Sequence, residues 1–273
     1  MHRQLRDLDR WYAEQAAPSA RTRSGLRGFL VGGTTAVVAV LATGHVLHSE
    51  GYEVGLNGVH VRRGDGPSVT VAGASDAYRF KAHQPGRPGE PVTYDPCRPI
   101  DVVVNDGIAP PGADSILDEA LAEVRRATGL ELRRVGRTIE VPRPQRPLRD
   151  HRYGRRWSPV LVAWTTPDVV PRLSGRVAGL GGSQPVVDEM SRRSTYVTGN
   201  VSLDTSDFEA ILARPGGEAE ARAIVMHELG HVVGLTHVDD PAQLMNADNV
   251  GLMKFGPGDL TGLALLGKGR CRG

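Results

Sequence analysis

The sequence is poor in lysine, in aromatic residues and in cysteine. Aromatic residues make up 5% of its 273 residues, and lysine occurs only at Lys81, Lys254 and Lys268. The positive charge is therefore nearly all arginine, which we attribute to coding bias, and the net charge is only +2. There is no internal repeat and no interleaving of aromatic and basic residues, which excludes a repeat protein and argues against nucleic-acid binding. The length and a hydrophobic content of 40% leave room for one ordinary domain with additional segments.

Long apolar runs are scarce as well, and one of them stands out. Residues 28–47 contain no Asp, Glu, Lys or Arg, and about 20 such residues suffice to cross a membrane as a helix. No Lys or Arg follows until Arg62, whereas basic residues precede the run at Arg3, Arg6, Arg10, Arg21, Arg23 and Arg27. This asymmetry predicts a single-pass protein of the cell membrane, with a cytoplasmic tail at 1–27, a transmembrane signal-anchor helix at 28–48 and an extracytoplasmic remainder. A cleaved signal peptide, which would give a secreted protein, and a buried core helix are the alternatives.

A glycine-rich segment follows the apolar run. Residues 49–91 contain short alternating stretches and end in the turn-rich run from Gln84 to Pro91. We interpret this segment as a stalk or linker with room for a hairpin. The boundary of the folded domain is therefore expected near residue 90, and the domain itself at 92–273.

The two cysteines, Cys97 and Cys271, lie near the two ends of this domain. In a domain exported from the reducing cytosol, this placement suggests a disulfide that joins the first strand to the C-terminal helix. Closing so long a loop would stabilise the fold by about 4–5 kcal/mol in the chain-entropy model.

The domain alternates strand and helix signals. Apolar and β-branched runs predict strands at 100–105, 131–135, 160–164 and 195–203, the third of them apolar enough to be central. Helices are predicted at 114–128, ended by Gly129, and at 207–214, where Ser206 and Glu209 form a capping box. We expect a glycine-rich bend at 176–183 and a solvated loop at 143–156, whose arginines alternatively face an anionic surface.

The most informative string is His-Glu-Leu-Gly-His-Val-Val-Gly-Leu-Thr-His at 227–237. It closes a predicted, mostly buried helix at 218–233, on which His227 and His231 are four residues apart and share one face. Gly234 stands where the helix must stop, because glycine takes a left-handed conformation without a Cβ clash. The chain can then return and bring His237 up as a third ligand. Three neutral imidazoles around an open fourth position describe a catalytic zinc site.

This string resembles the extended zinc signature of the metzincin metalloproteases. The matrixin branch is favoured by Asp240-Pro241 and by Met245, eight residues after His237. The sequence departs from that branch at Val238, where matrixins usually have Ser, and at Asn246-Ala247, where no Pro follows the Met. The resemblance spans about residues 92–273 and implies an α+β (α/β-like) fold: a twisted, mostly parallel sheet, an active-site helix and a small C-terminal subdomain. It also implies that Met245 packs beneath the zinc.

The function implied by this resemblance is zinc-dependent endopeptidase activity on proteins or peptides. Glu228, beside the first ligand, would act as the general base that takes a proton from the attacking water. The strand at 195–203 would be the sheet edge that pairs with extended substrate. A catalytically silent peptide-binding module on the same scaffold is the main alternative, and a structural zinc domain is the other.

Several finer points stay open at the level of the sequence. Asp204 resembles a calcium-binding position of matrixins, but the fuller acidic set is missing, so capping or turn formation is favoured for Asp204 and Asp207. Cys97 could cap the zinc as in matrixin zymogens, although the apolar strand directly after it favours a place in the fold. The acceptors that hold the free ring nitrogens of the ligands are not predicted beyond Asp239, Asp240 and backbone carbonyls. The oligomeric state and the substrate preference are not predicted.

Overall fold

The computed structural model describes residues 52–55, 58–61, 73–248 and 251–272. The predicted tail at 1–27 and signal anchor at 28–48 lie outside these residues, so both stay predictions. Within the described ranges, none of the helices is long and apolar enough to cross a membrane. A short antiparallel pair, β1 (Tyr52–Gly55) and β2 (Gly58–Val61), lies in the segment that was expected to form a stalk.

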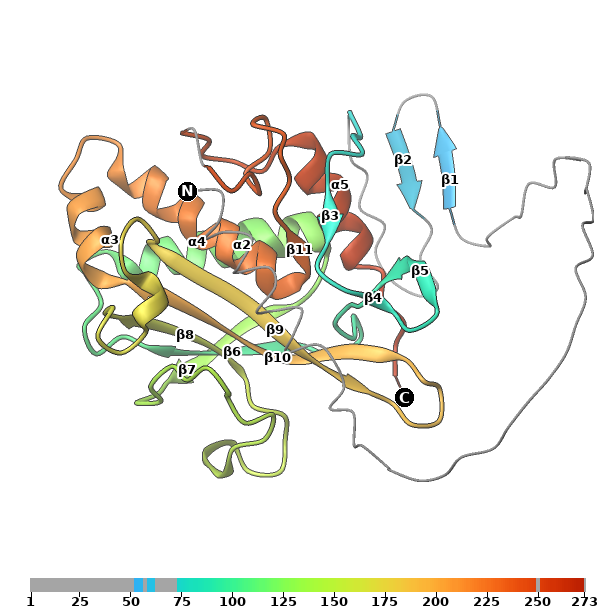
Figure 1. Ribbon diagram of the computed structural model, residues 1–273, viewed down its shortest axis with the longest axis horizontal. Coiled ribbons are helices and arrows are strands. Elements are labelled where there is room, and N and C mark those ends of the chain that lie inside the picture. The colour runs from blue at the N-terminus through green and yellow to red at the C-terminus, as the bar shows by residue number, and fades with distance from the viewer. Residues whose placement is uncertain (1–51, 56–57, 62–72, 249–250, 273) are drawn as a thin grey trace, which may run out of the picture.

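The centre of the domain is a five-stranded mixed sheet with helices against it (Figure 1). The strand order is β7-β6-β8-β10-β9, in which β6, β7, β8 and β10 are parallel and β9 runs antiparallel to β10. The fold is therefore α+β, as the sequence predicted. The strands are β6 (Ile100–Asn105), β7 (Leu132–Arg137), β8 (Val160–Thr165), β9 (Gly179–Val187) and β10 (Ser194–Asp204).

Helices α2 (Ala113–Thr128) and α4 (Gly217–Val233) pack against each other on the same side of the sheet (Figure 1). Both were predicted to within one residue at each end. Helix α2 ends at Gly129, whose φ of 72° is the left-handed conformation that glycine adopts most easily. The strand predicted to be central, β8, lies between β6 and β10 and is buried along its whole length.

The prediction that residues 195–203 form the edge of the sheet is wrong. They belong to β10, which lies between β8 and β9, and the edge strand is β9. Residues 176–183 were expected to form a bend, but those from Gly179 onward are the first half of this edge strand. Its glycines allow close packing: a Cβ on Gly181 would lie 2.2 Å from the backbone oxygen of Glu228 in α4.

The domain begins earlier than the expected boundary near residue 90. Strand β3 (Arg79–Phe80) pairs with β11 (Leu235–Thr236), which follows directly after α4. Strands β4 (His83–Gln84) and β5 (Arg87–Pro91) form a small hairpin beside it. The buried Gln84 side chain donates to the carbonyl of Ser194 and accepts its N–H, both at 2.9 Å. Turn signals in this segment therefore mark a hairpin built into the domain.

The loop at 143–156 is not solvated throughout, because Arg146 is buried. Its guanidinium pairs with the equally buried Glu140 at 2.8 Å and donates to Thr198 Oγ1 and to the carbonyl of Pro159. The pairing satisfies both charges inside the protein. A single inward arginine in an arginine- and proline-rich run gives no sequence signal that separates it from its exposed neighbours.

Helix α3 (Thr205–Leu212) starts earlier than predicted, and its cap is Asp204 instead of Ser206. The Asp204 carboxylate accepts the N–H groups of Ser206 at 2.9 Å and of Asp207 at 3.3 Å. Asp204 therefore has the capping role that was favoured over calcium binding. Calcium is not supported, since in the described part of the chain no other potential metal-binding group of three or more residues is present besides the three histidines and the cysteines with Asp95.

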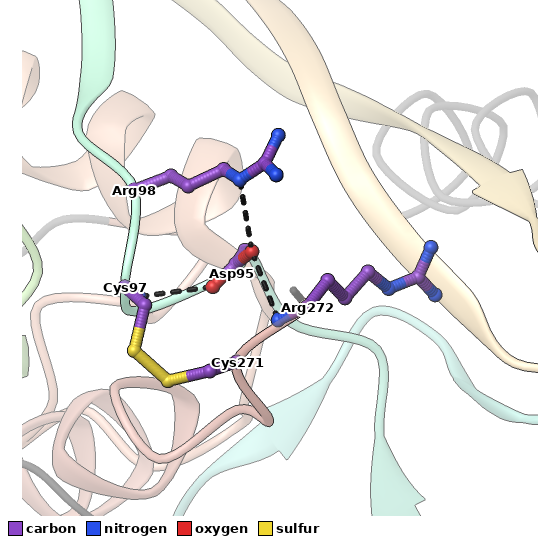
Figure 2. The surroundings of a disulfide bond; sticks show 5 residues. All are labelled: Asp95, Cys97, Arg98, Cys271 and Arg272. Carbon is purple, nitrogen blue, oxygen red and sulfur yellow. Dashed lines mark hydrogen bonds and ion pairs between the residues drawn. A yellow bond between two sulfur atoms is a disulfide. The ribbon is translucent and has the colours of Figure 1, made fainter.

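A disulfide joins Cys97, just before β6, to Cys271 near the C-terminus, and the Cα atoms of the two cysteines are 5.2 Å apart (Figure 2). Asp95 accepts the backbone N–H groups of Cys97 at 2.9 Å and of Arg272 at 3.2 Å, and Arg98 lies 3.5 Å from it. Because its sulfur is committed to this bond, Cys97 does not act as a zinc cap.

Candidate metal centre

Three histidine rings converge at the C-terminal half of α4. His227 and His231 project from one face of the helix, which ends at Gly234 with a φ of 123°. Strand β11 then leads back to His237. This strand is held by its pairing with β3. The Nε2 atoms of His227 and His237 are 3.1 Å apart, and those of His231 and His237 are also 3.1 Å apart. The sequence spacing predicted this convergence.

The other ring nitrogens fix the tautomers of two rings. His227 Nδ1 lies 2.7 Å from the carbonyl oxygen of Leu244, and His231 Nδ1 lies 3.0 Å from that of Leu235. Since a carbonyl oxygen can only accept, both Nδ1 atoms carry the proton and both Nε2 atoms present a lone pair. Burial lowers the pKa of His227 to about 3 and that of His237 to about 4, and it also lowers the pKa of His231. All three rings are therefore neutral at physiological pH.

This arrangement fits a cation. The lone pairs of His227 and His231 both face His237 Nε2, and one proton on that nitrogen can satisfy only one of them. A metal ion among the three nitrogens removes the repulsion. Zinc bound at about 2.0–2.1 Å in tetrahedral geometry separates its nitrogen ligands by about 3.3–3.4 Å, close to the separations here. The donor set and the spacing suit zinc.

Backbone carbonyls, one of the three candidates from the sequence, orient the ligands. Asp239 and Asp240 are engaged elsewhere. Asp239 is exposed and lies 4.0 Å from Arg79, and Asp240 accepts the N–H of Ala242 and a side-chain N–H of Gln243. A carbonyl acceptor leaves the imidazole uncharged and fixes its rotation.

Glu228 is buried and lines the same cleft as the three histidines. Burial raises the pKa of Glu228 to about 8, while Lys81 and a hydrogen bond from the backbone N–H of Gly181 act in the opposite direction. A cation held by the imidazoles would further favour the charged carboxylate. The edge strand packs tightly here, because a Cβ on Gly179 would lie 2.8 Å from Glu228 Cγ. Glu228 is therefore held in place by a strand as well as by its own helix.

Met245 packs against the turn of α4 between the two helical ligands. A Cβ on Gly230 would lie 2.6 Å from Met245 Sδ, so the thioether occupies the space that a side chain at this position would need. Both Met245 and the helix surface around it are buried. This position agrees with the packing role implied by the resemblance. The need for glycine at Gly230 was not predicted.

Sequence reasoning also missed Asp259, at the start of α5 (Pro257–Leu266). Its carboxylate accepts the backbone N–H groups of Leu244 at 2.5 Å, Gly256 at 2.9 Å and Met245 at 3.3 Å. Leu244 in turn holds the His227 ring through its carbonyl. Burial raises the pKa of Asp259 to about 6 against these hydrogen bonds. From the sequence alone, Asp259 could be recognised as an acidic residue in the first turn of a helix, which predicts a capping role. Its bonds to Leu244 and Met245 could not be predicted in this way.

The metal centre opens into a cleft of about 740 Å³. Glu228 and the three histidines form one part of its lining, and the edge strand β9 contributes Gly179, Leu180 and Gly181. Further lining residues come from α3, from the first half of α4, from residues 246–248, 251 and 253, and from Lys81, all of them far apart in the sequence. The cleft therefore brings the metal centre and the edge strand β9 together in one space.

No family model and no curated protein matches the sequence. Solved structures with a similar fold include archaemetzincin from Methanopyrus kandleri, with 16% identity, a TM-score of 0.37 and coverage of 60% of this chain and 92% of that one. They also include high choriolytic enzyme 1 of the medaka fish Oryzias latipes, described as a hatching enzyme zinc-protease, with 11% identity and a TM-score of 0.35 over 64% of this chain and 90% of that one. Identity and TM-score are both low, so the functional conclusion rests on the residues of the site.

Proposed function

We propose that this protein is a zinc-dependent endopeptidase of the metzincin type. The observation that carries the proposal is the convergence of three neutral imidazole nitrogens that line one cleft of about 740 Å³ together with the buried carboxylate of Glu228. Three ligands leave the fourth tetrahedral position open, as catalytic zinc sites do. The Asp240-Pro241 pair and the spacing of Met245 favour a matrixin-like branch.

The chain's own groups divide the chemistry between them. When bound, zinc supplies a Lewis acid for the scissile carbonyl and makes a water acidic enough to lose its proton near neutral pH. Glu228 accepts that proton and delivers it to the leaving amine, a role that needs a carboxylate. The N–H of Gly181 holds the Glu228 side chain. The carbonyls of Leu244 and Leu235 keep the His227 and His231 rings turned towards the centre.

The edge strand supports an extended peptide as the substrate. β9 pairs with β10 on one side, and within the described residues no strand covers its other edge. The N–H and C=O groups of that edge can pair with a substrate backbone by strand addition. Because Gly179 and Gly181 lie against Glu228, a peptide on this edge would pass the general base.

We also propose that the peptidase is anchored in the cell membrane by residues 28–48, with its domain outside. The proposal rests on the uncharged run and on the arginines before it. Protease added to intact cells should then remove the domain and spare residues 1–27, whereas a fully protected domain would contradict the orientation.

Cleavage of an unfolded protein by the purified full-length chain tests the activity. The chain should bind one zinc, and cleavage should stop with a chelator and return with zinc. Glu228→Gln should keep the zinc and lose the cleavage. A zinc-loaded wild-type chain that binds the unfolded protein without cutting it would contradict the proposal and favour a silent binding module.

A further inference from the structure

The side chain of Lys81 lines the cleft of the metal centre, and the catalytic steps described so far do not use it. Lys81 follows β3, and its backbone N–H donates to the carbonyl of Gly234 at 2.8 Å. That carbonyl belongs to the residue that ends α4, three residues before His237. The half-buried Lys81 side chain lines the same cleft as Glu228, His231 and His237. Its backbone is thus fixed to the metal-binding turn while its side chain faces the reaction space.

The charge of Lys81 affects the ionisation of Glu228 and of two metal-binding histidines. Burial raises the pKa of Glu228 and lowers the pKa of His231 and His237, and the charge of Lys81 opposes the first shift and adds to the other two. Two other cations line the cleft, but Arg214 is paired with Glu220 through contacts of 3.0 Å to both carboxylate oxygens, and Arg176 is exposed. Lys81 therefore differs from both in its half-buried position and in its effect on the reacting groups.

A cation in this position opposes metal binding. Lys81 and a divalent ion among the histidines repel each other by Coulomb's law. Lys81 therefore does not hold the metal. Its charge favours anions in the cleft, which are the Glu228 carboxylate and any substrate group that becomes negative during the reaction. The carbonyl oxygen of a peptide is such a group, because it becomes negative as water adds to the carbon.

Resting on the proposed function, we infer that the Lys81 ammonium is a further catalytic residue, which donates a hydrogen bond to the scissile carbonyl oxygen as that oxygen gains negative charge. No proton leaves Lys81. The water oxygen bonds to the carbonyl carbon and the carbon–nitrogen bond breaks. Both protons of the water reach the leaving nitrogen, the first of them through Glu228, so the products are one carboxylate and one protonated amine. A donor that strengthens its bond in the transition state raises kcat more than it changes KM.

The test compares Lys81→Met with Lys81→Arg in the full-length chain. Methionine keeps the length of the side chain and removes its charge, arginine keeps the charge, and both keep the backbone N–H. Arg79→Met is the matched control, because it removes one charge from the same segment at a side chain that does not line the cleft. For each protein, kcat, KM and the zinc dissociation constant are measured.

For Lys81→Met we expect a fall in kcat on the order of 100-fold, as for loss of an oxyanion donor, with KM changed by less than about threefold. Zinc should bind as tightly as in the wild type or more tightly, because the repulsion is gone. Lys81→Arg should recover at least about a tenth of the wild-type kcat, and Arg79→Met should match the wild type.

Three results would overturn the inference. Unchanged kcat in Lys81→Met means that the ammonium does not touch the reacting carbonyl, and a raised kcat means that Lys81 obstructs the cleft. Weaker zinc binding means that Lys81 supports the metal-binding turn. All three leave wild-type cleavage intact, so they are distinguishable from failure of the proposed function, in which the zinc-loaded wild type itself does not cleave.

Discussion

The two walls of the zinc cleft are built in different ways. The α4 wall takes Glu228 and the three histidines from residues 227–237, and backbone carbonyls hold two of the rings. The other wall combines the edge strand β9 with Lys81, from segments about 50 and 150 residues upstream in the chain. The first wall depends on which side chains are present. The second depends on side chains that are missing, because Gly179 and Gly181 let the strand approach Glu228.

The largest effect is expected on the α4 wall, from Glu228→Gln. The amide keeps the size of the side chain and cannot accept the water's proton, so kcat should fall about 10²–10⁴-fold. Zinc content, measured by metal analysis, should stay at the wild-type value. A variant that loses its zinc would show that Glu228 supports the metal centre instead of acting as the base.

Gly181→Ala tests the other wall. The added Cβ would lie 2.2 Å from the backbone oxygen of Glu228, so β9 has to move away from α4. We expect a loss of about 1–3 kcal/mol in the free energy of unfolding, together with lower activity. Denaturant unfolding checks the first and peptide cleavage the second. Gly89→Ala is the control, since a Cβ there meets nothing within 4 Å. Equal effects of the two substitutions would contradict the close packing of β9.

Asp259→Asn tests whether the α4 wall also needs support from outside its own sequence. One oxygen becomes an amide that cannot accept an N–H, which should lower the free energy of unfolding by about 1–3 kcal/mol and weaken zinc binding through Leu244. The pKa of Asp259 is raised from 3.8 to about 6 by burial. Its protonated form is thus favoured by folding, and stability falls as pH rises from about 4 to 6. In metal-free unfolding experiments, the stability of the variant should not show this fall between about pH 4 and 6. A variant with the same pH dependence as the wild type would contradict the raised pKa of Asp259.

The smallest effect is expected from Asp239→Asn. Asp239 is close to His237 in the sequence, but its side chain is exposed and lies 4.0 Å from Arg79. Exposed pairs of this kind contribute little. The zinc dissociation constant, measured by competition with a chelator, should stay within about twofold. A tenfold change would mean that Asp239, and not a carbonyl, orients a ligand.

The sequence predicted the metal centre better than the cleft around it. His227, His231 and His237 follow from the helical period and from the stop at Gly234, and both are local properties. Likewise the Cys97–Cys271 disulfide followed from two cysteines near opposite ends of a domain that was predicted to be exported. These predictions needed no knowledge of how distant segments pack.

The missed features all depend on contacts between distant segments. Glycines at 176–183 predicted a bend, whereas their function in β9 is to admit the backbone of α4. The turn signals before residue 90 predicted a linker, although Gln84 bonds to Ser194, which is 110 residues away in the chain. Asp259 and Lys81 act on the metal centre through partners that no local pattern names.

The most direct measurement is the zinc X-ray absorption spectrum of the full-length, zinc-loaded chain. We expect three imidazole nitrogens and one further oxygen donor at about 2.0–2.1 Å, the pattern of an open catalytic site. A sulfur ligand at about 2.3 Å, or four protein ligands, would describe a capped or closed structural site and would contradict the proposed catalytic zinc.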